Sequence, residues 1–275
     1  MQTTNVESWQ ITGNSPAAYE EYLVPGFFKP WAEKLVSLAE PAPDSTILDI
    51  ACGTGIVART AANEVGSDAR VTGIDINREM LSKASEMSEK SGLEVEWQQG
   101  DAIRLPFEDN RFDRIFCQQA MQFFTDPHKA LMEMQRVMKS DGTLALNILR
   151  PIAYNPAYKI LADCLDEHAG EHAANMMRSP FPSWNQEMLR NMVNDAGFKK
   201  THIQLEIISM RYPSPEEFLK REAESSPLAE EIESMESERR MALIGDLSTS
   251  LEAYIDDMGV VFPMETHMIS AKKFD

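Results

Sequence analysis

Basic residues are scarce in this sequence. It holds 26 lysines and arginines against 44 aspartates and glutamates, which gives a formal net charge of −18 over 275 residues. A strongly negative surface repels nucleic-acid phosphates and anionic lipid head groups at long range. We therefore expect nucleic acid not to be a partner of this protein.

Long apolar runs and a leader sequence are also lacking. No stretch approaches the roughly 18 consecutive apolar residues of a membrane span. The first residues, Met1 to Glu7, show no basic region followed by an apolar core. These absences predict a cytoplasmic protein that does not insert into a membrane.

Cysteine is rare and its spacing is irregular. Cys52, Cys117 and Cys164 are odd in number and far apart, which favours reduced thiols over a disulfide framework. A three-cysteine site for a soft metalloid such as arsenic is an alternative, although free cysteine commonly packs as a small hydrophobe. The run from His168 to His172 fits the H-x-x-E-H pattern of one metalloprotease class, but Gly170 weakens the helix that such a site needs. We predict no metal site.

One stretch carries the strongest local signal. Residues 46–50 form a short apolar run, a turn with Gly53 and Gly55 follows, and Ile56 opens a helical segment. Glycine tolerates positive φ and lets a ligand approach the backbone, and the helix N-terminus offers free amides. The spacing from Gly53 to Ala58 fits the dinucleotide fingerprint G-x-G-x-x-G/A. An NAD(P)-dependent dehydrogenase is therefore one candidate function.

Strands and helices then alternate along the chain. The expected strands are 46–50, 70–75, 93–99, 112–118, 143–148, 202–210 and 264–272, and the expected helices between them are 56–62, 77–90, 125–137 and 185–196. Polar residues end several strands, at the edge where open α/β sheets bind ligands. Asp75 lies 20 residues beyond Gly55, and its carboxylate can accept hydrogen bonds from both hydroxyls of a ribose.

Three segments fall outside this alternation. Residues 1–43 are expected to be an N-terminal helical arm or lid, in which Pro25-Gly26 and Pro30 split residues 15–39 into two short helices. The domain proper would cover 44–275, with helical insertions at 150–184 and 213–258 that form a substrate cap. The glutamates of the second insertion are typical of a solvated helix face.

Five ordered blocks between residues 44 and 150 resemble a known family. They are Leu48–Gly55, Gly73–Asn77, Gln99–Ala102, Leu105–Phe107 with Phe112-Asp113, and Arg136–Gly142. Together they are similar to class I S-adenosylmethionine-dependent methyltransferases, in particular to quinone-biosynthesis C-methyltransferases. The resemblance implies a Rossmann-like α/β fold: seven strands, mostly parallel with an antiparallel last strand, helices on both faces, and helical cap insertions.

The resemblance also assigns cofactor contacts by position. It implies S-adenosyl-L-methionine as cofactor, S-adenosyl-L-homocysteine as product, and contacts from Asp49, Ala51, Gly53, Thr54, Gly55, Asp75, Ile76, Met80, Asp101, Ala102 and Gln118. Electrostatics agrees, because a carboxylate at Asp49 would repel a diphosphate and attract the ammonium of a methionine moiety. Ile76 and Met80 could equally be ordinary core residues. Arg59 is the nearest basic residue after the loop, but we expect it to lie too far along its helix to serve the cofactor carboxylate.

The methyl acceptor is less defined. Residues 118–124 lack the Asp-Pro-Pro-Tyr or Asn-Pro-Pro-Tyr sequence of amino methylation, and we assign no catalytic base. Candidate substrate contacts are Tyr22, Gln122, Phe123, Tyr154 and Trp184. We predict methylation of a small, partly apolar molecule by a monomer or homodimer. The alternatives are the dehydrogenase and a catalytically silent cofactor-binding partner subunit.

Overall fold

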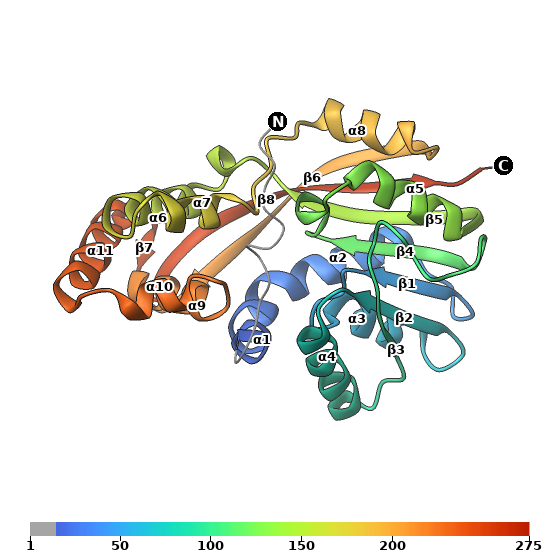
Figure 1. The fold of residues 1–275 in the computed structure, drawn as a ribbon, viewed down its shortest axis with the longest axis horizontal. Coiled ribbons are helices and arrows are strands. Elements are labelled where there is room, and N and C mark those ends of the chain that lie inside the picture. The colour runs from blue at the N-terminus through green and yellow to red at the C-terminus, as the bar shows by residue number, and fades with distance from the viewer. Residues whose placement is uncertain (1–14, 275) are drawn as a thin grey trace. The chain divides into compact units, whose positions relative to one another are not determined.

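The structure is a computed structural model that describes residues 15–274. Its strands are β1 (Thr46–Ile50), β2 (Arg70–Asp75), β3 (Glu96–Gln99), β4 (Phe112–Gln118), β5 (Met138–Leu149), β6 (Lys199–Tyr212), β7 (Ile255–Asp256) and β8 (Gly259–Lys272). They form one sheet in the order β3-β2-β1-β4-β5-β8-β6, with β7 paired to β8 (Figure 1). β1 to β5 run parallel, and the C-terminal strands are antiparallel. The predicted fold class is confirmed, with the two-residue β7 as an addition.

The chain divides into two compact units. The sheet unit comprises residues 28–148, 184–206 and 267–274, and the helical unit comprises residues 15–27, 149–183 and 207–266. β6 and β8 contribute residues to both. The helical unit thus contains most of both predicted insertions. The roles of lid and substrate cap stay predictions.

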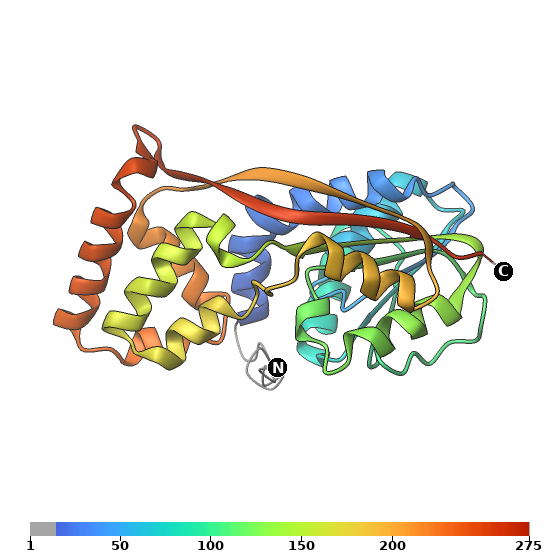
Figure 2. The same cartoon turned by 90° about the horizontal axis from the view of Figure 1, so that it is seen from above.

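Helices cover both faces of the sheet unit. The helices are α2 (Lys29–Ala39), α3 (Ile56–Val65), α4 (Arg78–Ser91), α5 (Pro127–Val137) and α8 (Gln186–Asp195). α2 and α3 lie on one face, and α5 and α8 lie on the other (Figure 2). Side-chain caps explain where three of them begin, because Asn77, Asp126 and Asn185 each accept backbone N–H groups of the first turn. Gly92 ends α4 in the left-handed conformation.

The N-terminal helical segment differs from the prediction. Instead of two short helices, residues 15–39 form one uninterrupted run: α1 (Ser15–Ala18), a π-helical stretch (Tyr19–Phe28) and α2. Pro25 lies inside the π-helical stretch, where it supplies no N–H but does not end the helical run. Pro30 lies in the first turn of α2, where its fixed φ is compatible with the helix. The prediction of two separate helices was wrong, because the chain stays helical through both prolines and changes to π-helical spacing around Pro25.

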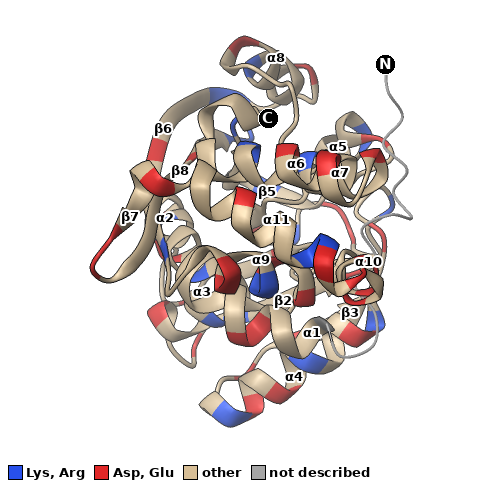
Figure 3. Cartoon of the chain, turned by 90° about the vertical axis from the view of Figure 1, so that its left-hand side faces the viewer, with Lys and Arg blue, Asp and Glu red and all other residues tan. Residues whose placement is uncertain are grey.

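The helical unit is built around buried aromatic residues. Its helices are α6 (Pro156–His168), α7 (Glu171–Arg178), α9 (Pro215–Glu224), α10 (Ala229–Ser234) and α11 (Ser237–Ser250). The core is an aromatic cluster of Tyr158, Phe181, Tyr212, Phe218 and Phe262. Acidic and basic residues are interspersed along α9 to α11 (Figure 3).

Two further expectations can be compared with the structure. All three cysteines are free and buried, as expected for individually packed thiols. The helix required by H-x-x-E-H does not form, because Gly170 with φ 97° separates α6 from α7. Among the helices of residues 15–274, none is long and apolar enough to cross a membrane.

Candidate functional site

The glycine loop between β1 and α3 has an unusual backbone. Ala51, Gly53 and Gly55 have positive φ angles of 52°, 56° and 84°. The N–H of Cys52 donates to Ile74 O at 3.1 Å, and the N–H of Gly55 donates to Cys52 O at 2.8 Å. The loop therefore turns sharply from β1 into the first turn of α3, as the sequence predicted.

Asp49, at the end of β1, is buried, with 1% of its surface exposed. Its Oδ2 accepts the N–H of Ala58 at 3.0 Å. Its Oδ1 is buried and has no hydrogen-bond partner among residues 15–274. Burial, with the nearby charge of Asp75, raises the pKa of Asp49 to about 8, against the lowering effect of the Ala58 hydrogen bond. A cation beside Oδ1 would relieve this cost.

Asp75, at the end of β2, secures the loop. Its Oδ2 accepts the N–H of Gly53 and its Oδ1 accepts the N–H of Asn77, each at 2.8 Å. Burial raises the pKa of Asp75, and these backbone hydrogen bonds oppose the shift. Each carboxylate oxygen can accept a second hydrogen bond, so the side chain can still bind hydroxyl groups.

Arg59 and Trp97 also contact this region. Arg59 is buried, and its Nη1 donates to Thr54 O at 2.9 Å, so its side chain reaches the glycine loop. The expectation that it does not serve the cofactor carboxylate stays a prediction. The long side chain folds back along the first turn of α3. Trp97 of β3 lies against Gly55 and Gly73. Its role was missed because the contact joins distant parts of the sequence.

The other predicted cofactor contacts occupy different environments. Ile76, after β2, has 54% of its surface exposed, so it is not a core residue, whereas Met80 is buried in α4. Asp101 is exposed, and its Oδ1 accepts the N–H of Ile103 at 3.1 Å. Ala102 next to it is buried. Their roles toward a cofactor stay predictions.

A group of side-chain amides lies where β4 and β5 end. Gln118 and Asn147 are register partners in these strands, and the N–H of Gln119 donates to Asn147 Oδ1 at 3.1 Å. Nε2 of Gln122 donates to Gln119 O at 3.0 Å. Within the described chain, Gln118 Oε1, Gln119 Nε2, Gln122 Oε1 and Asn147 Nδ2 are buried without hydrogen-bond partners.

The unpaired amide atoms at the ends of β4 and β5 destabilise the folded protein, since each buried polar group without a partner costs about 1–3 kcal/mol. Gln119 also has φ 50°, a strained value for a residue with a side chain. The sequence predicted binding roles for Gln118 and Gln122 but not for Gln119 and Asn147. The signal was their position at the carboxyl ends of β4 and β5, the edge already singled out for the earlier strands.

The predicted substrate contacts are divided between the units. Tyr22 and Tyr154 belong to the helical unit, where each ring lies beside a guanidinium: Arg221 is 5.5 Å and Arg150 is 3.4 Å from the respective ring centroid. Gln122, Phe123 and Trp184 belong to the sheet unit, and Trp184 packs against its core. A substrate role for any of the five stays a prediction.

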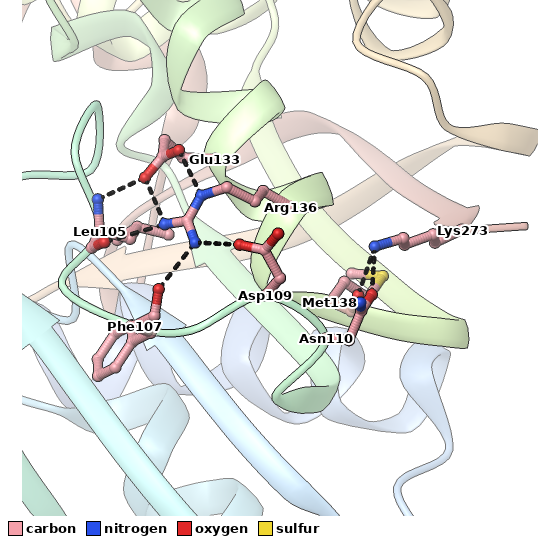
Figure 4. A network of polar contacts seen from close by, with 8 residues as sticks. All are labelled: Leu105, Phe107, Asp109, Asn110, Glu133, Arg136, Met138 and Lys273. Atoms are coloured by element: carbon pink, nitrogen blue, oxygen red, sulfur yellow. Dashed lines mark hydrogen bonds and ion pairs between the residues drawn. The ribbon is translucent and has the colours of Figure 1, made fainter. Parts of the chain in front are cut away.

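The connector from β3 to β4 is anchored by Arg136 of α5 (Figure 4). Its guanidinium binds both carboxylate oxygens of Glu133 at 2.7 and 2.8 Å. It also donates to Asp109 Oδ1 and to the carbonyls of Phe107 and Leu105. Glu133 in turn accepts the N–H of Leu105 at 2.8 Å. The network fixes the connector to the helix.

A family model described as a methyltransferase domain matches residues 41–197, which include this loop and the ends of β1 to β5. The chain belongs to this methyltransferase family. A demethylmenaquinone methyltransferase of Desulfitobacterium hafniense is 36% identical over 129 residues, which are 46% of this chain and 51% of that protein. A ubiquinone/menaquinone biosynthesis C-methyltransferase of Bordetella parapertussis is 32% identical over 186 residues, which are 64% and 71% of the two chains.

The chain thus spans about half the length of the first of these relatives. Two solved structures share the fold of this methyltransferase-family chain. The YcgJ protein of Bacillus subtilis superposes with a TM-score of 0.61 at 21% identity, covering 90% of this chain and 99% of that one. Phosphoethanolamine N-methyltransferase 2 of Haemonchus contortus, in complex with S-adenosyl-L-methionine, superposes with a TM-score of 0.60 at 20% identity. The match covers 94% of this chain and 57% of that one.

Proposed function

We propose that this protein transfers a methyl group from S-adenosyl-L-methionine to a small, partly apolar molecule. The single observation that carries the proposal is the buried Asp49 carboxylate at the glycine loop, with Oδ1 unpaired within residues 15–274. The relatives named as quinone methyltransferases and the neighbour solved with S-adenosyl-L-methionine support the cofactor and the apolar acceptor.

The residues present fit this cofactor. Its methionine ammonium would pair with Asp49 Oδ1 and favour the ionised carboxylate, which a diphosphate would disfavour. Ala51, Gly53, Thr54 and Gly55 would surround the methionine part. Asp75 would accept the ribose hydroxyls, and Ile76, Met80, Asp101, Ala102 and Gln118 would surround adenine. The exposed Ile76 side chain offers an apolar surface that the protein does not bury itself.

When bound, the cofactor supplies a methyl group on a sulfonium, which is already a strong electrophile. The protein's part is to orient the acceptor against that methyl group and to exclude water. Such alignment alone can supply a large share of the rate enhancement, so a general base is not required for every acceptor. We therefore assign no catalytic base.

Turnover with labelled cofactor tests the proposal. The full chain is incubated with methyl-labelled S-adenosyl-L-methionine and a panel of apolar phenols, thiols and amines, and labelled product is counted. We expect methyl transfer to at least one of these classes of acceptor. The variant Asp49→Leu should lose this activity, and the matched control Asp126→Leu, at the cap of α5, should keep it. Cofactor binding without transfer to any acceptor would instead favour the silent partner subunit. Failure to bind the cofactor would contradict the proposal.

A further inference from the structure

Three side-chain amides of the sheet unit form a connected group that the cofactor assignment does not use. Gln119 directly follows β4, Gln122 lies in the short helical turn Met121–Phe123, and Asn147 lies near the end of β5. All three are at least nine-tenths buried. Three hydrogen bonds join them. The Gln119 N–H donates to Asn147 O at 3.0 Å and to Asn147 Oδ1 at 3.1 Å, and Gln122 Nε2 donates to Gln119 O at 3.0 Å.

These bonds determine which amide atoms are free. Since Asn147 uses Oδ1 as an acceptor, its Nδ2 is the unpaired end, and since Gln122 uses Nε2 as a donor, its Oε1 is unpaired. Gln119 Nε2 is unpaired as well, when every residue from 15 to 274 is considered. The group therefore offers two amide NH2 groups as donors and one carbonyl oxygen as acceptor, all uncharged.

This combination matches a neutral group that both accepts and donates hydrogen bonds, and a hydroxyl is the smallest such group on an organic ligand. A hydroxyl oxygen can accept from both amide donors while its proton is donated to Gln122 Oε1. A carboxylate only accepts, so Gln122 Oε1 would stay unpaired, and an ammonium only donates, so both amide N–H groups would stay unpaired. Buried polar groups left without partners strongly disfavour the wrong ligand.

We propose that Gln119, Gln122 and Asn147 bind a neutral hydroxyl group of the methyl acceptor and act as its positioning residues. The proposal rests on the methyltransferase function proposed above and adds the chemical group that is recognised. The strained backbone at Gln119 fits this role, because strain at a residue whose Nε2 has no partner within residues 15–274 is typical of a functional position. The three amides neither gain nor lose a proton in this scheme.

Four probes that share one ring system test the proposal. Binding of 2-naphthol, 2-naphthoate, 2-(aminomethyl)naphthalene and naphthalene to the full chain is titrated by NMR, with and without S-adenosyl-L-homocysteine. We expect 2-naphthol to bind at least tenfold more tightly than the other three. Equal affinities, tighter binding of a charged probe, or no binding of 2-naphthol would overturn the proposal.

The variant Gln119→Met has nearly the same shape and removes the donor without breaking a side-chain hydrogen bond within the described protein. It should lower 2-naphthol affinity about tenfold and leave naphthalene affinity and the melting temperature unchanged. Gln122→Met should also abolish the preference for 2-naphthol over naphthalene. The matched control is Gln135→Met on α5, outside the group, which should keep the preference.

A merely structural role would lower the affinities of all four probes together, and that result would overturn the proposal. Binding of S-adenosyl-L-homocysteine is measured in the same samples. If it binds but 2-naphthol is not preferred, this inference fails and the methyltransferase proposal stands. If it does not bind, the methyltransferase proposal fails whatever the probes show.

Discussion

The indole ring of Trp97 occupies the space that a side chain at Gly55 would need. A Cβ atom built on Gly55 would lie 2.3 Å from Trp97 Cη2, closer than real Cβ contacts allow. The indole is held in place, since its Nε1 donates to Ser88 Oγ of α4 at 3.1 Å. The glycine loop is thus specified by packing against β3 as well as by backbone conformation.

Gly55→Ala should therefore destabilise the protein for two reasons. It places a methyl group against the indole, and it puts alanine at φ 84°. We expect the free energy of unfolding to fall by ~2–4 kcal/mol, the sum of overpacking and left-handed strain. Denaturant titration of Gly55→Ala and of Gly55→Ala/Trp97→Leu separates the two causes. If the alanine costs as much without the indole as with it, the steric explanation is wrong.

Arg136→Lys should release the β3 to β4 connector. Lysine cannot bind both Glu133 oxygens and two backbone carbonyls at once. We expect a loss of ~1.5–3 kcal/mol, the range for hydrogen bonds to charged groups. Arg211→Lys is the control, because Arg211 binds both oxygens of Asp256 in an exposed pair, which should contribute under ~1 kcal/mol. Chemical denaturation should show the difference, and equal losses would contradict the anchoring role.

Glu222 should make the stability of the helical unit depend on pH. Its buried Oε1 accepts the hydroxyls of Tyr158 at 2.8 Å and Tyr212 at 2.7 Å. Burial raises the pKa of Glu222 from 4.5 to about 7, against the lowering effect of the two tyrosine hydrogen bonds. The folded state therefore binds more protons than the unfolded chain between these values, and the free energy of unfolding falls as pH rises through this window.

The free energy of unfolding contributed by Glu222 should fall by on the order of 3 kcal/mol between low pH and pH 8. Glu222→Gln keeps an acceptor for the tyrosines and cannot ionise, so its stability should vary less with pH. Thermal unfolding of both proteins from pH 5 to 8, with Glu217→Gln at a partly buried ion pair on the same helix as control, measures the difference. Parallel pH profiles for Glu222→Gln and wild type would contradict the raised pKa.

Asp49 should couple ligand binding to proton release. Because its pKa is raised to about 8, much of the ligand-free protein carries a proton on Asp49 at pH 6 to 7. Pairing with an ammonium favours the ionised form, so affinity for S-adenosyl-L-homocysteine should rise with pH over this range. Calorimetry in two buffers of different ionisation enthalpy measures the protons released, and Asp49→Asn should release fewer. If the affinity of the wild type for S-adenosyl-L-homocysteine did not change with pH, this coupling would be ruled out.

Local sequence signals sufficed for the sheet and its order along the chain. Short apolar runs before polar residues identified β1, β2 and β4, and Gly53 and Gly55 identified the loop. Features that depend on distant contacts could not be predicted in this way. Trp97 is 42 positions from Gly55, and Gln119 meets Asn147 only because β4 and β5 pair. The continuous helix around Pro25 could not be predicted for another reason, since a π-helical stretch leaves no clear local sequence pattern.

Calorimetry of the full chain with S-adenosyl-L-homocysteine and with NAD⁺ tests the central claim most directly. The titrations are done above pH 8, where Asp49 is largely ionised. Both ligands contain adenosine, but only the first has an ammonium that can pair with ionised Asp49, and only the second has a diphosphate that the ionised carboxylate would repel. We predict clear binding of S-adenosyl-L-homocysteine, binding of NAD⁺ at least a hundredfold weaker, and a selective loss of the first in Asp49→Leu. Tighter binding of NAD⁺ than of S-adenosyl-L-homocysteine would contradict the account.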